Sequence, residues 1–428
     1  MTTARTRERE PSLLRIQAFR RVFTAAAAST VGTQVSFLAI PLLAVTLLDA
    51  TPAQVGILGV LRTLAFAVLG LPAGAWLDRT RRRAVMVVAD LARAVLLASV
   101  PVAWWLGALR MNQLYVVVLV TGVATLFFDV AAQSYLPFVV GRDRLAAANS
   151  RLQSWNSVAE VAGPSLAGYL VQLASAPVAV LFDAATYLWS ALVLAGIRRR
   201  EPRPRSAPDR RLVNGIAEGV RFVFGHPLLR PIALSGAAVN LFIQIAIVMM
   251  PLLFTRVLGL SGAQLGLFFG CGGVGTLLGA LTANRLAARF GTVPVVWVLG
   301  LAVTPFGLLV AFVGRGPWLW VAAASWLVLF YRIGSDNVLL VSLRQRITPD
   351  HLLGRMNATM RFVMTGALAV GAALAGAIGQ YADVRTAVRV AAVGLALSWV
   401  PRAFSPMRLS RRRPPVRHPR VPTCRPGR

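Results

Sequence analysis

The chain of 428 residues contains twelve long apolar stretches separated by short polar connections. A stretch of about 20 apolar residues crosses the hydrocarbon core of a bilayer as one α-helix. Apolar residues make up 57% of the chain and charged residues only 14%, which excludes an ordinary soluble domain. We therefore expect an all-α membrane protein. The predicted spans are 22–48, 54–76, 85–106, 114–136, 148–173, 177–197, 231–255, 262–284, 292–313, 317–341, 357–379 and 386–404.

The arginine residues predict the orientation of these spans. All 45 basic residues are arginine, which favours a bacterial genome, and 36 of them fall in the terminal segments or at alternate connections. Because positive residues are retained on the cytosolic side, both termini are expected in the cytosol of a multi-pass plasma-membrane protein. This topology also accounts for the net charge of +30, so nucleic-acid binding is not needed to explain it.

Patterns that carry chemistry are absent from the sequence. It contains no glycine loop for phosphate, no histidine or cysteine spacing for a metal, and no nucleophile with a matching base. We expect a protein that is not an enzyme and that holds no metal or cofactor. Its partners would be the lipid bilayer and small molecules, and any driving force would be a proton gradient.

The two parts of the chain repeat each other. Thr51-Pro52-Ala53-Gln54-Val55-Gly56 recurs 210 residues later as Ser261-Gly262-Ala263-Gln264-Leu265-Gly266, and Asp129 recurs 207 residues later as Asp336. Each six-residue segment predicts a capping box at the start of a helix. The expected organisation is a cytosolic segment (1–21), a six-helix half (22–197), an Arg/Pro-rich linker with an amphipathic helix (198–230), a second half (231–404) and a disordered basic tail (405–428).

The connection after the second span carries the most specific motif. It runs Gly74-Ala75-Trp76-Leu77-Asp78-Arg79-Thr80-Arg81-Arg82-Arg83 and resembles the loop between the second and third helices of the major facilitator superfamily. Further matches resemble the macrolide-efflux and enterobactin-exporter branch, the transmembrane secretion effectors. They are Phe19-Arg20-Arg21, Phe127-Phe128-Asp129, Leu145, Asn149, Gly163-Pro164, Pro349-Asp350 and Gly354-Arg355.

This resemblance implies two six-helix halves around a central cavity, which opens alternately to the two membrane faces. It also implies a gating network on the cytosolic face. A carboxylate at a helix end, followed by a cationic loop, can form a charge latch there. The residues expected in the network are Gly74, Asp78, Arg79, Arg82, Arg83 and Asp129. In the second half Gly279 is followed by Ala283-Asn284-Arg285, without an aspartate, so any latch there should be weaker or absent.

Charged residues within spans need a partner or a role, because each costs about 2.5–3.5 kcal/mol on insertion scales. Asp90 and Arg93 are three residues apart, and Arg332 and Asp336 are four apart. Each pair can neutralise itself on one helix, so we assign both pairs a structural role. Asp183, in the sixth span, is expected to make interhelical hydrogen bonds.

Arg62 and Glu160 have no charged partner on their own helices, and both lie near the middle of their spans. The resemblance places the second and fifth helices around the central cavity, where a carboxylate can exchange protons as the cavity opens. We hypothesise that Glu160 couples transport to protons or binds a cationic substrate, with Arg62 available as its counter-ion. The alternative is a buried structural charge.

The fifth span contains Gly163-Pro164-Ser165-Leu166-Ala167-Gly168, which resembles the fifth-helix signature of drug/proton antiporters, with Ala167 in place of a glycine. Pro164 bends the helix, and Gly163 and Gly168 let a neighbour approach closely. The expected function is secondary-active export of a small amphipathic molecule, such as a drug, antibiotic or siderophore-like compound, by a monomer using proton antiport. Uptake or uniport of a small metabolite is the alternative, and a non-transporting membrane scaffold is a further one.

Overall fold

The computed structural model describes residues 13–77, 80–141, 143–197 and 212–405, in which all regular structure is helical. The first six α-helices are α1 (Gln17–Leu47), α2 (Pro52–Leu77), α3 (Arg82–Trp105), α4 (Met111–Val140), α5 (Leu145–Leu173) and α6 (Ala176–Ala195). The others are α7 (Leu212–Gly225), α8 (Leu229–Leu252), α9 (Gly262–Phe290), α10 (Thr292–Val303), α11 (Pro317–Ile347), α12 (Leu353–Tyr381), α13 (Val384–Leu397) and α14 (Val400–Ala403). Short helical turns join or extend these: η1 (Leu13–Arg15), η2 (Leu253–Val257), η3 (Thr304–Phe312) and η4 (Asp350–Leu352).

Within the described residues, eleven helical segments are long and apolar enough to cross a membrane. They include η2, η3, η4 and α14 as continuations of α8, α10, α12 and α13. The remaining predicted span corresponds to α5, a helix of 29 residues that carries Asn149, Arg151, Asn156 and Glu160 between its start and its middle. The fold is therefore all-helical as predicted, and α5 is the helix that departs from the apolar pattern.

The predicted capping boxes are both present and geometrically alike. The Thr51 amide donates to Oε1 of Gln54 at 2.8 Å, and the Gln54 amide donates to Oγ1 of Thr51 at 3.3 Å. At the start of α9 the corresponding distances between Ser261 and Gln264 are 2.8 and 3.3 Å. The repeated segments are thus confirmed as equivalent helix starts.

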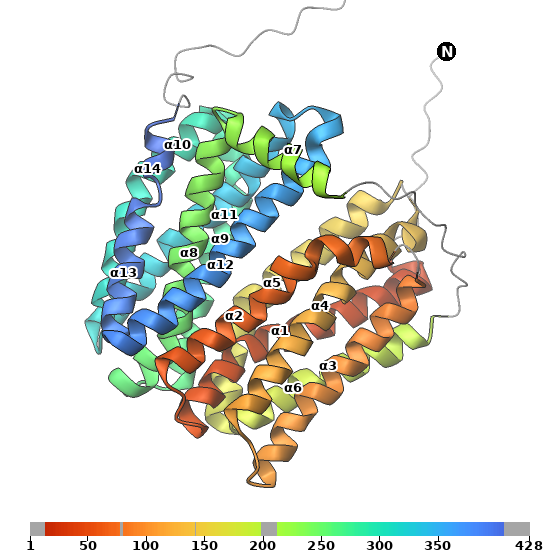
Figure 1. Cartoon of the computed structure of the whole chain (residues 1–428), viewed down its shortest axis with the longest axis vertical. Coiled ribbons are helices and arrows are strands. Elements are labelled where there is room, and N and C mark those ends of the chain that lie inside the picture. The colour runs from red at the N-terminus through yellow and green to blue at the C-terminus, as the bar shows by residue number, and fades with distance from the viewer. Residues whose placement is uncertain (1–12, 78–79, 142, 198–211, 406–428) are drawn as a thin grey trace, which may run out of the picture.

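The helices form two groups, α1–α6 and α8–α13, which Figure 1 shows side by side. Within them, α1, α3, α4 and α6 pack mainly on helices of the first group, and α8, α10, α11 and α13 on helices of the second. The groups meet where α5 packs on α9 and where α2 packs on α12. Glycines permit both crossings. A Cβ atom on Gly266 would lie 2.4 Å from the carbonyl oxygen of Pro164, and one on Gly56 would lie 2.6 Å from the Cα atom of Gly376. We call this part of the molecule, where α2 and α9 begin, the crossing end.

A side-chain contact also joins the two groups at the crossing end. Asp49, in the turn after α1, has a φ of 48°, and its carboxylate lies 3.4 Å from the Arg256 guanidinium in η2. The same guanidinium donates to the Val45 carbonyl oxygen at 3.0 Å. Arg256, which belongs to the second helix group, therefore binds the end of α1 in the first group.

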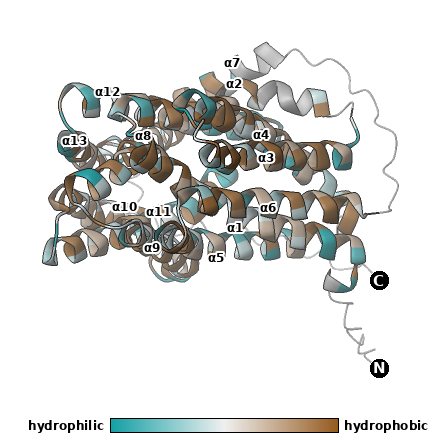
Figure 2. Cartoon of the chain, turned by 90° about the horizontal axis from the view of Figure 1, so that it is seen from below, coloured by the Kyte–Doolittle hydropathy of each residue, from teal (hydrophilic) through white to brown (hydrophobic). Residues whose placement is uncertain are grey.

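Apolar side chains cover the outside of the bundle as well as its interior. Leu173, Trp105 and Val95 are exposed by 83%, 81% and 69%, and hydrophobic residues dominate the helices of both groups in Figure 2. Since a soluble protein rarely exposes a continuous apolar surface, this outer face is suited to the acyl chains of lipid.

Helix α7 lies within residues 198–230, and it packs on the start of α12 and on α8. Its Val223 is fully buried in a cluster with Met356 and Met360. Glu218 of α7 forms an ion pair with Arg355 of α12. The helix is thereby attached to the second group.

Candidate functional site

Two adjoining cavities lie in the bundle. The first, which we call the apolar cavity, has a volume of about 230 Å³ and is lined by residues of both helix groups. The second, which we call the polar cavity, has a volume of about 390 Å³ and is lined by α1, α3, α4 and α5. Thr33 of α1 and Thr125 of α4 line both, so the two cavities meet at these hydroxyl groups.

The polar residues of α5 face the polar cavity. Asn149, Asn156 and Glu160 line it together, and their spacing of seven and four residues places them on one side of the helix. Asn156 accepts a hydrogen bond of 3.3 Å from Thr30 of α1. Glu160 is accessible, and no ion pair involves it among the described residues. The low hydropathy of α5 thus follows from its position along this cavity.

Asp129 of α4 lines the same polar cavity as Glu160. Two residues before it, the Phe127 ring packs edge-on against Trp76 near the end of α2, with 5.2 Å between ring centroids. Asp129 therefore lies near the level of the connection between α2 and α3. It forms no ion pair with any described residue, although Arg93 lines the cavity beside it.

The other residues of the predicted gating network are described only in part. Asp78 and Arg79 lie outside the described residues, and Gly74 belongs to the last turns of α2. Arg82 donates to the Ser134 carbonyl of α4 at 2.9 Å. Arg83 donates to the Leu194 carbonyl at 3.0 Å and to that of Ala195, both at the end of α6. A cation is favourable at a helix C-terminus, so the start of α3 is tied to the ends of α4 and α6.

The structure separates Arg62 from Glu160. Arg62 lines the apolar cavity, whereas Glu160 lines the polar one. The Arg62 guanidinium lies over the Phe37 ring of α1, 4.1 Å from its centroid. Within the described part of the chain, Arg62 has no ion pair with a carboxylate. The hypothesised pairing of these two residues is therefore not present in this conformation.

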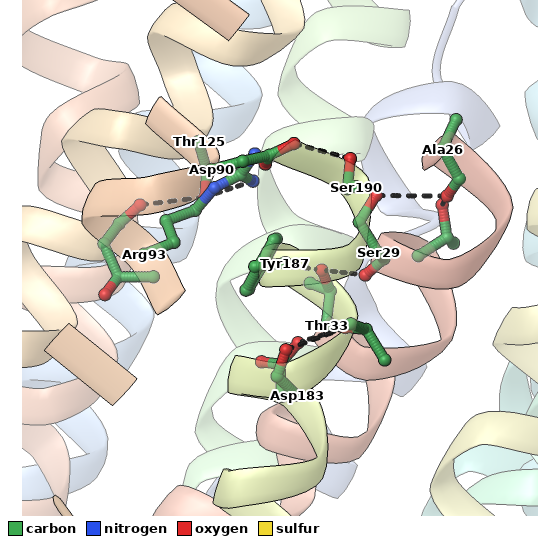
Figure 3. A network of polar contacts seen from close by, with 12 residues as sticks. Ala26, Ser29, Thr33, Asp90, Arg93, Thr125, Asp183, Tyr187 and Ser190 are labelled. Atoms are coloured by element: carbon green, nitrogen blue, oxygen red, sulfur yellow. Dashed lines mark hydrogen bonds and ion pairs between the residues drawn. The ribbon is translucent and has the colours of Figure 1, made fainter. Parts of the chain in front are cut away.

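Asp90 and Arg93 form an ion pair in a buried polar network, several of whose residues line the two cavities (Figure 3). Asp90 also accepts a hydrogen bond of 2.5 Å from Ser190 of α6. The Arg93 guanidinium lies 4.5 Å from the ring centroid of Phe128 and 4.1 Å from that of Tyr187. Both members of the pair are buried, so their charges are compensated inside the protein.

Asp183 lies in the same region and is 1% exposed. It is within 3.3 Å of the Thr186 hydroxyl, while the Tyr187 and Thr33 hydroxyls lie 2.7 Å apart between α6 and α1. Figure 3 shows Asp183, Tyr187 and Thr33 where α6 and α1 meet. A Cβ atom on Gly32 of α1 would approach Asp183 Oδ1 to 2.3 Å. Glycine at this position thus lets α1 close over the Asp183 side chain.

Asp336, the repeat equivalent of Asp129, is held by two arginines. Its Oδ2 lies 3.5 Å from Nε of Arg332 and 2.7 Å from Nη1 of Arg402. Arg332 also donates to the Thr304 hydroxyl at 2.5 Å. Asp336 is 8% exposed. The two halves therefore differ: one aspartate is enclosed between cations, and the other lines a cavity without an ion partner among the described residues.

The predicted fifth-helix signature lies at the crossing with α9. A Cβ atom on Gly168 would lie 2.4 Å from the Gly262 carbonyl oxygen, and one on Gly163 would lie 2.3 Å from Cβ of Gln34. Pro164 is buried, and α5 continues through it. The two glycines thus allow α5 to contact both α1 and α9 at backbone distance.

Two contacts of this region have no signal in the sequence. The aromatic contact of Arg62 with Phe37 joins residues of different helices, and no local pattern marks it. The ion pair of Asp336 with Arg402 joins residues 66 positions apart, a separation that helix periodicity does not connect. Among the described residues, no group of histidine, cysteine, aspartate and glutamate side chains could hold a metal ion.

Comparison with known proteins gives matches over most of the chain. A family model described as transmembrane secretion effector matches residues 11–413. The chain is 28% identical over 360 residues to the multidrug efflux pump Tap of Mycolicibacterium fortuitum, covering 80% of this chain and 85% of the relative. It is 29% identical over 391 residues to the enterobactin exporter EntS of Salmonella typhi, covering 89% and 90%.

Solved structures share the fold at low sequence identity. A bacterial homologue of the iron transporter ferroportin in its inward-facing state gives a TM-score of 0.74 at 20% identity, covering 94% of this chain and all of the other. The outward-facing state gives a TM-score of 0.60 at 19% identity, covering 90% and 98%. The helix arrangement is therefore one already known among transporters.

Proposed function

Because the chain belongs to the transmembrane secretion effector family of the major facilitator superfamily, we propose that it exports a small amphipathic organic molecule by alternating access. The family makes it a transporter rather than an enzyme, and a multi-pass protein of the bacterial plasma membrane. The names of its relatives indicate drugs and enterobactin as their cargo. A drug, antibiotic or siderophore-like molecule is accordingly the proposed substrate class here.

The proposed topology has twelve crossings, with α5 as the twelfth, and both termini in the cytosol. The distribution of arginine supports it, and it places the crossing end on the outer face. The two six-helix halves would then touch outside and be separable inside. The higher TM-score with the inward-facing transporter supports the same assignment. In this interpretation a single chain, acting as a monomer, is in its inward-facing state.

The polar face of α5 is the observation that carries the proposal. Asn149, Asn156 and Glu160 lie along an internal cavity. Polar side chains are costly within a membrane helix and mark the path of a substrate or ion, so this cavity is suited to polar cargo or ions. Glu160 has no ion partner among the described residues, which leaves its carboxylate free to take up and release a proton. Inward proton flow through Glu160 is the proposed driving force.

Asp129 is the proposed link between this cavity and the gating network of Gly74, Asp78, Arg79, Arg82 and Arg83. It lines the polar cavity and lies near the end of α2. An aspartate without an ion partner here can acquire one when the halves close on the inner face. Its counterpart Asp336 is already enclosed by two arginines, so the proposed gate belongs to the first half.

Proton-linked export can be tested in inverted membrane vesicles that carry an imposed pH gradient. A panel of antibiotics and siderophores is added in turn, and both substrate accumulation and loss of the gradient are recorded. We expect at least one compound to accumulate and to dissipate the gradient. Glu160→Gln should abolish the proton movement, whereas Glu218→Gln, a glutamate of α7, should leave it intact.

Four other results would contradict parts of this proposal. Accumulation without proton movement would indicate uniport, and transport in the opposite direction would indicate uptake. An absence of flux for every compound would favour a scaffold. Proton-coupled efflux that persists unchanged in Glu160→Gln would rule out the coupling role of that residue.

A further inference from the structure

Arg62 and Arg361 lie within predicted spans and form no ion pair among the described residues, but only Arg62 of these two lines the apolar cavity. Arg93 is paired with Asp90, and Arg332 with Asp336. Among the described residues, Arg62 has neither an ion pair nor a side-chain hydrogen bond; its neighbour is the Phe37 ring at 4.1 Å. A guanidinium stays charged in proteins. An unpaired cation at this depth needs an anion from elsewhere.

The surroundings of Arg62 are aromatic. Phe37, Phe66 and Phe269 line the apolar cavity with it. Phe37 of α1 and Phe269 of α9 meet edge to face with 6.2 Å between ring centroids, so the two rings come from opposite helix groups. Contact with a ring stabilises the cation but accepts none of its five N–H donors. Those donors remain available to a ligand that enters the cavity.

The other ionisable groups of this cavity are already engaged. Asp183 is 1% exposed and lies beside the Thr186 hydroxyl. Tyr187 is likewise 1% exposed, and its hydroxyl contacts Thr33. Gln244 of α8 adds a neutral amide to the lining. The accessible charge in the apolar cavity is therefore the positive one on Arg62, whereas the polar cavity presents the carboxylates of Asp129 and Glu160.

We propose that the apolar cavity binds an aromatic carboxylate, with its acid group on Arg62 and its ring against Phe37 and Phe269. The planar fork of a guanidinium matches the two oxygens of a carboxylate, and aromatic rings favour edge-to-face contact with a further ring. This inference rests on the proposed export function, for which it names the substrate class. Because Phe37 and Phe269 belong to different helix groups, separation of the groups at the crossing end would dismantle the site and release the ligand.

The test is equilibrium binding to the full-length protein in nanodiscs of phosphatidylcholine, with empty nanodiscs subtracted. The probes are radiolabelled 2-naphthoate, its neutral analogue 2-naphthalenemethanol and the cation 2-naphthyltrimethylammonium. Wild type should bind the carboxylate most tightly. Arg62→Gln should weaken carboxylate binding by about tenfold or more while leaving the alcohol unchanged, because only the charge-assisted contact is lost. Arg62→Lys keeps the charge but lacks the planar fork, so its affinity for the carboxylate should lie between those of wild type and Arg62→Gln.

Arg361→Gln is the matched control, because Arg361 also lies over an aromatic ring, that of Phe66 at 5.7 Å, but does not line the cavity. It should bind naphthoate as wild type does, and elution as a single species in size-exclusion chromatography shows that each variant is folded. Equal binding of the three probes by wild type, or unchanged naphthoate binding in Arg62→Gln, would overturn the proposal. Binding needs no flux, so a protein that binds naphthoate but transports nothing would refute the export function and leave this site standing.

Discussion

Gly56 of α2 and Gly376 of α12 face each other so closely that a Cβ atom on Gly56 would lie 2.6 Å from the Cα atom of Gly376. Gly56 closes one copy of the repeated segment, and Gly266 closes the other, where it meets the Pro164 carbonyl of α5. The repeat therefore supplies two equivalent glycine crossings. Both hold the helix groups together at the same end.

Gly56→Ala should weaken this end of the molecule. The added methyl group meets backbone atoms, which cannot rotate away, so the two groups must separate locally. Spin labels at Leu106 and Tyr381, which are 66% and 90% exposed and belong to different groups, would report a longer distance. Gly70→Ala is the matched control in the same helix, since a Cβ atom there meets nothing within 4 Å. An unchanged distance in Gly56→Ala would contradict the role of the crossing.

Asp49→Asn should also favour opening of the crossing end, but by less. The Asp49–Arg256 pair is solvent-accessible, and such pairs contribute about 0.2–1 kcal/mol, so the populations should shift by about fivefold at most. The same spin-label pair measures this shift. Added salt should move wild type in the same direction by screening the pair. If added salt changes the spin-label distance in Asp49→Asn as much as in wild type, the salt effect does not come from the Asp49–Arg256 pair.

Asp336→Asn and Asp129→Asn should have opposite profiles, although the residues are repeat equivalents. Loss of the Asp336 charge leaves Arg332 and Arg402 uncompensated in the interior, which should lower the free energy of unfolding by about 3–5 kcal/mol. Asp129 has no ion partner among the described residues, so Asp129→Asn leaves no arginine uncompensated. It should change the free energy of unfolding by under about 0.5 kcal/mol while reducing transport. SDS titration of the purified variants measures the first effect, and vesicle efflux the second. Equal destabilisation of both variants would refute the asymmetry.

Asp383→Ala should destabilise α13 in a pH-dependent way. Asp383 caps this helix by accepting from the Thr386 amide at 2.7 Å and from its hydroxyl at 2.6 Å. These hydrogen bonds from Thr386 lower the pKa of the Asp383 carboxyl, so its stabilisation is present above the usual aspartate pKa and is lost as the pH falls through the folded-state pKa. At pH 7 the substitution should cost about 1 kcal/mol, and the difference from wild type should shrink below about pH 4.

Thermal unfolding of wild type and Asp383→Ala at pH 7 and at pH 3 would measure this difference. Thr386→Val is the control, because it removes the hydroxyl donor and keeps the amide donor, and it should give a smaller pH-dependent loss. A destabilisation of equal size at both pH values would show that the carboxylate charge is not what stabilises the helix end.

Helix α5 shows how far the sequence allowed prediction of the fold and the site. Its position and its Gly163-Pro164 segment were predicted, and Glu160 was selected as an unpaired charge. The presence of Asn149 and Asn156 beside Glu160 on a cavity wall was not predicted. A one-dimensional pattern shows which residues share a helix face, but it does not show which helix that face meets.

Arg62 marks the corresponding limit for the site. Its sequence position predicted a midplane charge, and Glu160 was the available carboxylate at the same depth. In the structure the two residues line different cavities, and Arg62 lies on Phe37 instead. Two residues at equal depth in the membrane can face different sides of the bundle. The side that each residue faces decided which groups it contacts.

By itself, the sequence determined the helical class, the positions of the helices, the two capping boxes and the family. These follow from apolar length, from hydrogen bonds between residues three apart and from short motifs, all of which act locally along the chain. Only the tertiary structure decided which groups from other helices contact each buried charge. Asp336 meets Arg402, Asp90 meets Ser190, and Arg62 meets an aromatic ring. The physical reason is that the cost of a charge in a membrane protein depends on the groups that neighbouring helices bring to it, and helix packing sets those neighbours.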